Sequence, residues 1–196
     1  MTKLASICVY CGSNAGTRPE YAAAAKAMGK AIADRGLTLV YGGGKVGLMG
    51  ILADACLTAG GRVVGIIPEF LALKEVAHPG LTEMVVVDSM HTRKAEMERR
   101  SDGFIALPGG IGTMEELFEV WTWSQLGQHR KPCGLLDVTG YYADLNAFLD
   151  RMATDGFVNP EHRGMLHVGE DPVSLLDAFA AYEAPPADIR IKVQQT

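Results

Sequence analysis

The chain has 196 residues and a formal net charge of −5 at pH 7, with 48% apolar and 21% charged residues. This is the composition of a globular protein, and the length suits a single domain over residues 1–182 with a C-terminal tail over residues 183–196. The negative charge argues against a nucleic-acid partner, because nonspecific binding depends on clustered Lys and Arg. The sequence has no run of about 20 apolar residues, so we expect no membrane span.

Apolar strands and helical segments alternate along the chain. Strands are predicted at residues 5–9, 38–41, 62–67, 83–87, 103–107 and 133–137. Helices are predicted at residues 20–35, 48–59, 90–100, 115–126, 141–154 and 173–182. The alternation predicts an α/β fold, a Rossmann-like doubly wound parallel sheet of about six or seven strands with helices on both faces. Right-handed crossovers then bring all strand-to-helix loops to one edge of the sheet, where such folds bind ligands.

Three of these loops are rich in glycine or small polar residues, at residues 11–14, 42–47 and 108–113. Glycine lets a ligand approach the backbone closely. None of the loops matches a Walker loop or a dinucleotide-binding fingerprint. Because three such loops meet at one edge, we predict a nucleotide-sized site there, and we expect the long irregular segment 68–80 to border it.

A fourth loop supplies a cation. Ser89 or Asp88 can cap the helix that starts at Met90, which puts Arg93 near the ligand edge. A helix N-terminus alone gives a phosphate about 0.3–1 kcal/mol, so oriented binding needs an added guanidinium. Arg93 on a solvated face is the alternative, and its position favours a functional role.

Glu116 has two interpretations. Thr113 and Glu116 match a capping box, in which Thr113 caps the helix and Glu116 reaches back to the backbone. Glu115 would then be a favourable acid in the first turn. The alternative is that Glu116 is a catalytic carboxylate beside an anion site, and the residues alone do not decide between cap and catalyst.

The four cysteines are Cys8, Cys11, Cys56 and Cys133. Cys8 and Cys11 form a C-x-x-C pair, but zinc would need a second ligand pair and a thioredoxin-like site would lie at a helix start. We therefore expect no bound metal, and we expect the four cysteines to be free thiols in a reducing cytoplasm.

The sequence resembles the LOG ("Lonely Guy") family. Residues 108–116 fit the motif P-G-G-x-G-T-x-x-E, and residues 90–94, Met-His-Thr-Arg-Lys, match a second motif of that family. The loops at 11–13 and 42–50 also look like the family, and the similarity runs from residue 7 to about residue 156. Members are nucleoside 5′-monophosphate phosphoribohydrolases that activate cytokinins, and they have often been mislabelled lysine decarboxylases.

The resemblance implies a cytoplasmic hydrolase that cleaves the N-glycosidic bond of adenosine 5′-monophosphate, plain or N6-modified, to the free base and ribose 5-phosphate without a cofactor. The family's catalytic residues fall on Arg93 and Glu116. The substrate-binding residues that it implies are Gly12, Ser13, Gly43, Gly44, Met90, Lys94, Pro108, Gly109, Gly110, Gly112 and Thr113. The helix around Trp121 and Trp123 is apolar around most of its circumference, which fits burial within the monomer or at an interface between subunits. The resemblance implies the interface of a homodimer.

Two other functions remain open on the sequence. The same cradle would serve a non-catalytic nucleotide-binding carrier or sensor. A pyridoxal-phosphate decarboxylase would need a Schiff-base lysine, and only Lys45 and Lys94 are near the predicted site.

Overall fold

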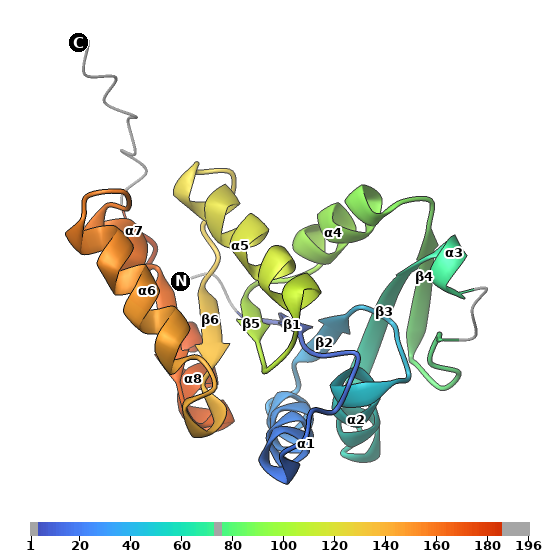
Figure 1. The fold of residues 1–196 in the computed structure, drawn as a ribbon. Helices are drawn as coiled ribbons and strands as arrows, with labels where there is room; N and C mark the ends of the chain where they lie inside the picture. The colour runs from blue at the N-terminus through green and yellow to red at the C-terminus, as the bar shows by residue number, and fades with distance from the viewer. Residues whose placement is uncertain (1–3, 73–75, 186–196) are drawn as a thin grey trace.

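The computed structural model describes residues 4–72 and 76–185, and its seven strands form one parallel sheet (Figure 1). The strands are β1 (Ser6–Tyr10), β2 (Thr38–Tyr41), β3 (Arg62–Pro68), β4 (Glu83–Val87), β5 (Phe104–Ala106), β6 (Cys133–Leu136) and β7 (Leu166–Gly169). They lie in the order β4-β3-β2-β1-β5-β6-β7, and each neighbouring pair is parallel. The predicted doubly wound parallel sheet is confirmed.

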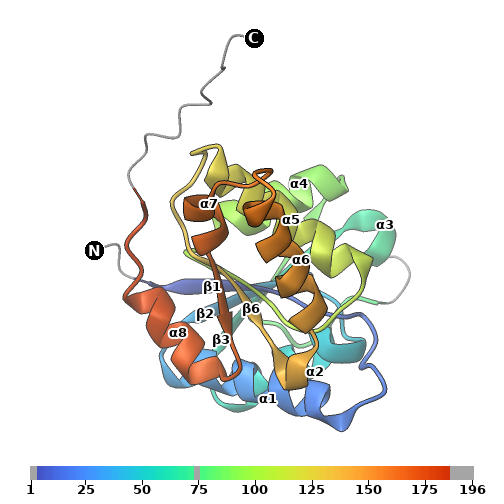
Figure 2. The same ribbon diagram turned by 60° about the vertical axis from the view of Figure 1, so that its left-hand side comes forward.

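Helices cover both faces of the sheet (Figure 2). On one face lie α1 (Pro19–Asp34), α2 (Gly47–Thr58) and α8 (Pro172–Ala180), and on the other lie α4 (Met90–Arg99), α5 (Ile111–Gln125) and α6 (Ala143–Thr154). The shorter elements are α3 (Glu69–Ala72), the 3₁₀ turn η1 (Val138–Gly140) and α7 (Pro160–Gly164).

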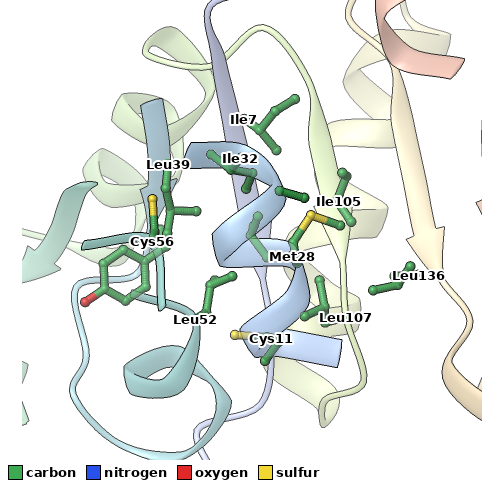
Figure 3. Packing of buried hydrophobic residues seen from close by; sticks show 14 of the residues in the cluster. Ile7, Cys11, Met28, Ile32, Leu39, Leu52, Cys56, Ile105, Leu107 and Leu136 are labelled. Atoms are coloured by element: carbon green, nitrogen blue, oxygen red, sulfur yellow. The ribbon is translucent and has the colours of Figure 1, made fainter. Parts of the chain in front are cut away.

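The buried strands separate the core into two clusters. In β1, Ile7 and Val9 face α1, where they join Met28 in one cluster, and Figure 3 shows Ile7 and Met28 among its side chains. Cys8 and Tyr10 belong to the cluster on the opposite face. This alternation follows from the two-residue period of a strand, and apolar helices on both faces explain why the strands read as continuous apolar runs.

The order of the strands creates a crevice. After β1 the chain builds β2, β3 and β4 outward on one side, and then returns to place β5 on the other side of β1. The loops that follow β1 and β5 therefore lead to helices on opposite faces. In open α/β sheets, ligands bind outside the carboxyl ends of the strands at such a switch point.

The structure differs from the predicted elements at several places. The helix α5 begins at Ile111 rather than at residue 115, and α6 begins at Ala143 because η1 precedes it. The strand β7 was not among the predicted strands. It is a short edge strand in which Leu166 is buried and Val168 is 45% exposed, so it lacks the apolar run of the central strands.

The C-terminal helix α8 ends at Ala180, before the predicted end at residue 182. Arg130 Nη2 then donates to the carbonyls of Ala184 and Pro185 at 3.1 and 3.0 Å. Most of the expected tail, residues 186–196, lies outside the described residues.

Over residues 4–72 and 76–185, no helix has the length and apolar character needed to cross a bilayer. In the same residues, no three His, Cys, Asp or Glu side chains gather as metal ligands. The four cysteines are buried and free, and burial raises the pKa of the Cys8 and Cys11 thiols.

Candidate active site

A cavity of about 450 Å³ lies at the carboxyl edge of the sheet. It is lined by residues that follow β1, β2, β3 and β5 and by one side chain of α4, namely Cys11, Gly12, Ser13, Gly42, Gly44, Val46, Met49, Ile67, Leu71, Val76, Arg93, Gly110, Ile111, Gly112, Thr113 and Glu116. A smaller cavity of about 260 Å³ shares Gly12, Ser13 and Gly110 with it and extends toward Tyr21 and Tyr141. The predicted glycine-rich loops therefore do meet at one site.

The loops after β1 and β5 are joined by their backbones. The N–H of Gly12 donates to the carbonyl of Pro108 at 3.1 Å. A Cβ at Gly12 would lie 2.8 Å from Asn14 O, and a Cβ at Gly109 would overlap Thr113 Oγ1. A Cβ at Gly109 would also lie 2.9 Å from the nitrogen of Gly12, so this position needs glycine for the close approach of the two loops, and the approach places the start of α5 beside β1.

The first turn of α5 has free backbone donors. Gly110 is the N-cap residue and supplies no side-chain cap, so the N–H groups of the first turn face the cavity edge rather than a capping side chain. A Cβ at Gly110 or Gly112 would meet no atom within 4 Å, which leaves open space above the backbone. A helix N-terminus with exposed N–H groups and little side-chain bulk binds anions.

The predicted capping box is wrong. Because α5 begins at Ile111, Thr113 is the third helical residue and Glu116 lies in the second turn. Glu116 cannot reach back to the N-cap backbone from there. Glu115 is not in the first turn either, and it accepts a hydrogen bond from Lys94 Nζ at 2.5 Å.

Arg93 is held at the bottom of the cavity by main-chain oxygens. The helix α4 is capped by Ser89, whose Oγ accepts from the N–H of Thr92 at 3.1 Å. The buried Arg93 side chain donates from Nε to the carbonyl of Ile66 at 3.1 Å and from Nη2 to the carbonyl of Gly42 at 3.2 Å. A Cβ at residue 42 would overlap Nη2, so the guanidinium needs glycine there.

Arg93 and Glu116 form an ion pair inside the cavity. Arg93 Nη1 lies 3.4 Å from Glu116 Oε1, and the two side chains are 10% and 13% exposed. Burial raises the pKa of Glu116, and the positive charge of Arg93 offsets part of that rise. A carboxylate with a raised pKa in a partly dry cavity is suited to accept a proton near neutral pH.

Of the predicted site residues, most line the two cavities. The larger one contains Gly12, Ser13, Gly44, Arg93, Gly110, Gly112, Thr113 and Glu116, and the smaller one contains Pro108 and Gly109.

Gly43, Met90 and Lys94 lie behind the lining residues. Gly43 has φ +76°, and its carbonyl accepts from the N–H of His78 at 2.9 Å. Met90 Sδ contacts Arg93 Nη1 at 3.8 Å. Lys94 Nζ donates to Glu115 and, at 3.0 Å, to Glu119. None of the three lines either cavity, and their predicted role in binding substrate stays a prediction.

The sequence analysis missed the apolar part of the site. Val46, Met49, Ile67, Leu71 and Val76 line the larger cavity beside the pair of charges. Of the segment 68–80, Leu71 and Val76 line the cavity, as expected, and the carbonyl of Val76 accepts from the N–H of Lys45 at 2.8 Å. Residues 73–75 of the segment lie outside the described residues. Ile111 also lines this cavity and is 91% exposed.

Comparison with solved structures identifies proteins with a similar fold. The chain superposes on the molybdenum cofactor binding protein of Rippkaea orientalis with a TM-score of 0.70 and 22% identity, over 92% of this chain and 98% of that one. The molybdenum cofactor carrier protein of Chlamydomonas reinhardtii gives a TM-score of 0.68 at 21% identity, over 92% of this chain and 100% of that one. At this identity the likeness concerns the fold alone.

The sequence comparisons identify the family. Residues 49–179 match the family model described as "Possible lysine decarboxylase". The chain is 51% identical over 176 residues to the probable cytokinin riboside 5′-monophosphate phosphoribohydrolase LOGL9 of Oryza sativa subsp. japonica, which covers 90% of this chain and 78% of that protein.

Two further relatives bear similar names. The cytokinin riboside 5′-monophosphate phosphoribohydrolase of Rhodococcoides fascians is 51% identical over 181 residues, 92% of this chain and 90% of that one. LOG7 of Arabidopsis thaliana is 46% identical over 187 residues, 95% of this chain and 86% of that one. The chain thus belongs to the LOG family, whose named members are cytokinin riboside 5′-monophosphate phosphoribohydrolases.

Proposed function

We propose that this protein hydrolyses the N-glycosidic bond of adenosine 5′-monophosphate, plain or N6-modified, and releases the free base and ribose 5-phosphate. The observation that carries the proposal is the pairing of Arg93 and Glu116 at 3.4 Å in the cavity onto which the open N-terminus of α5 faces. A phosphate held by α5 would bring the attached ribose toward the carboxylate. The names of the relatives support the same reaction.

The phosphate is bound by the backbone of α5. The N–H groups at Gly110, Gly112 and Thr113 donate to its oxygens, and the helix dipole contributes about 0.3–1 kcal/mol. The loops at Gly12, Ser13 and Gly44 line the nucleotide, and Pro108 and Gly109 shape the loop that precedes α5. The apolar side chains around Met49 and Leu71 offer a dry surface for the base and for an N6 substituent.

In the reaction the bond between C1′ of the ribose and N9 of the base breaks. The electron pair stays on N9, which takes up a proton, and the sugar passes through an oxocarbenium-like transition state. Water adds to C1′, and Glu116 accepts its proton and stabilises the positive charge on the sugar. Arg93 holds the carboxylate in place. Water and a carboxylate are sufficient for this hydrolysis, so we propose no cofactor.

We further propose a cytoplasmic homodimer that binds a small-molecule nucleotide and no nucleic acid. Free buried cysteines and the net charge of −5 support the location and the lack of a nucleic-acid partner. Trp121 is 3% exposed and donates from Nε1 to the carbonyl of His162 at 3.2 Å, so this part of α5 packs within the protomer. The exposed Leu126 at the end of α5, 64% exposed, is the apolar surface that we assign to the partner subunit.

The function is tested by incubating the purified protein with AMP, N6-isopentenyl-AMP and adenosine and quantifying ribose 5-phosphate and free base. We expect both nucleotides to be cleaved and adenosine to be left intact. Binding of AMP without ribose 5-phosphate would instead identify a carrier or sensor. A decarboxylase is disfavoured because Lys45 is exposed and Lys94 is engaged by two carboxylates.

A further inference from the structure

Tyr141 makes a hydrogen bond to the loop that precedes α5. Its hydroxyl donates to the carbonyl of Gly109 at 2.6 Å, and its ring lines the smaller cavity. The next residue, Tyr142, is buried and donates from its hydroxyl to the carbonyl of Leu107, also at 2.6 Å. Two neighbouring tyrosines thus hold the end of β5 and the loop after it.

The bond to Gly109 fixes a peptide group that would otherwise be free to turn. Trans peptide geometry points the carbonyl of Gly109 and the N–H of Gly110 in opposite directions, and no described peptide bond is cis. A peptide between two glycines can rotate at little steric cost. When Tyr141 holds the carbonyl on its side, the N–H of Gly110 faces the opposite side of the loop, and Gly110 lines both cavities.

The neighbouring carbonyls of the loop are also occupied. The carbonyl of Pro108 accepts from the N–H of Gly12 at 3.1 Å, and that of Gly110 accepts from the N–H of Met114 at 3.2 Å. The Tyr141 hydroxyl therefore binds the carbonyl of Gly109, which lies between these two carbonyls in the sequence. With all of these carbonyl oxygens bound, none turns toward an anion in front of α5, where it would repel the anion.

The ring of Tyr141 is placed independently of its hydroxyl. It packs edge-on against Tyr21, with ring centroids 5.4 Å apart, and against Tyr142 at 4.9 Å. The turn that leads to it contains Thr139 with φ 54°, the one non-glycine residue with a positive φ in the described chain. A β-branched residue rarely adopts this conformation and keeps it only where the surrounding contacts require it.

We propose that Tyr141 is a positioning residue for the substrate phosphate, because its hydroxyl locks the Gly109–Gly110 peptide with the N–H toward the anion. The role rests on the proposed function, since it assumes that the phosphate binds at the start of α5. Tyr141 acts through the loop and does not itself contact the phosphate.

The test compares Tyr141→Phe with Tyr21→Phe, two substitutions that each remove one hydroxyl from residues lining the same cavity and keep the edge-on contact of the two rings. Calorimetry measures the dissociation constants of ribose 5-phosphate and of adenosine. We expect Tyr141→Phe to weaken ribose 5-phosphate binding about 5-fold to 10-fold, the effect of one lost hydrogen bond. Its affinity for adenosine, and both affinities of Tyr21→Phe, should match those of the wild type.

Unchanged ribose 5-phosphate binding by Tyr141→Phe would overturn the proposal, and so would an equal loss of affinity for adenosine, which indicates general damage to the site. If the wild type does not bind ribose 5-phosphate at all, both the proposed role of Tyr141 and the proposed phosphate site are wrong. If the wild type binds ribose 5-phosphate but does not cleave AMP, the proposed reaction fails while the role of Tyr141 is still measured.

Discussion

Glu116 is placed by Arg93, whereas Arg93 is placed by the sheet. The guanidinium reaches Glu116 with Nη1 at 3.4 Å, while its other nitrogens bind the carbonyls of Ile66 and Gly42 at the ends of β3 and β2. The orientation of the cation therefore does not depend on the carboxylate. Glu116 is left with its charge near the cavity and with a fixed partner, which is the arrangement that a reacting carboxylate needs.

We predict that Arg93→Lys lowers kcat/KM for AMP by about 100-fold, because an ammonium cannot reproduce the fork that joins two carbonyls and Glu116. Steady-state release of ribose 5-phosphate measures the effect. Arg99→Lys is the control, since Arg99 lies exposed on the same helix and binds only Glu96 there. A loss below about threefold in Arg93→Lys would contradict the role of the guanidinium fork.

Gly42→Ala should lower the activity by displacing the side chain of Arg93. The added Cβ overlaps Nη2 of Arg93, so the guanidinium must move and the fold loses about 1–3 kcal/mol of unfolding free energy. Kinetic assays and chemical denaturation measure the two effects. Gly164→Ala is the matched control, because a Cβ there meets nothing within 4 Å. Wild-type kinetics in Gly42→Ala would show that Arg93 is not constrained by this contact.

Glu116 should lower the stability of the fold at high pH. Burial raises its pKa above the value in the unfolded chain, so between these two pKa values the folded protein binds more protons and stability falls as pH rises. We expect Glu116→Gln to have a higher melting temperature than the wild type above the raised pKa and the same one near the ordinary carboxyl pKa. Thermal scans against pH test this, with the exposed Glu170→Gln as control. A pH-independent difference would exclude the ionisation of Glu116 as its cause.

Lys94→Met should affect stability more than substrate binding. Lys94 is 10% exposed and binds Glu115 and Glu119, and the second oxygen of Glu119 is already buried without a partner. Removing the ammonium leaves these carboxylates uncompensated, at a cost of about 1–3 kcal/mol. Lys30→Met, which breaks an exposed pair with Asp34, should cost less than about 1 kcal/mol.

Chemical denaturation and the KM for AMP separate the two roles of Lys94. A stability like that of the wild type together with a greatly increased KM would assign Lys94 to direct phosphate binding instead.

The fold could be predicted because local and global patterns agree. The structure has the alternation of strands and helices that the sequence predicts. The apolar strands, the glycines at helix ends and the cap at Ser89 each indicate this same order of elements. The start of α5 was misplaced because Thr113 and Glu116 satisfy a local capping pattern. The backbone bond from Gly12 to Pro108 and the bond from the Tyr141 hydroxyl to the carbonyl of Gly109 instead fix the loop so that the helix begins earlier.

Many of the residues that line the cavity could be named from the sequence, but their contacts could not. That Arg93 lies beside Glu116 depends on the strand order, which brings the end of β3 within reach of α5 across β2 and β1. Lys94 is next to Arg93 in the sequence, yet the turn of α4 directs it to Glu115 and away from the cavity. Tyr141 was not predicted, because its hydrogen bond to Gly109 joins segments that are distant in the sequence.

The central claim is that the Glu116 carboxylate carries the hydrolysis, and the most direct test is single-turnover release of ribose 5-phosphate from AMP by Glu116→Gln. The substitution keeps the shape and removes the charge. We predict a rate about 1000-fold below that of the wild type, in the range that general base catalysis supplies, with AMP still bound. Release at the wild-type rate would contradict the claim.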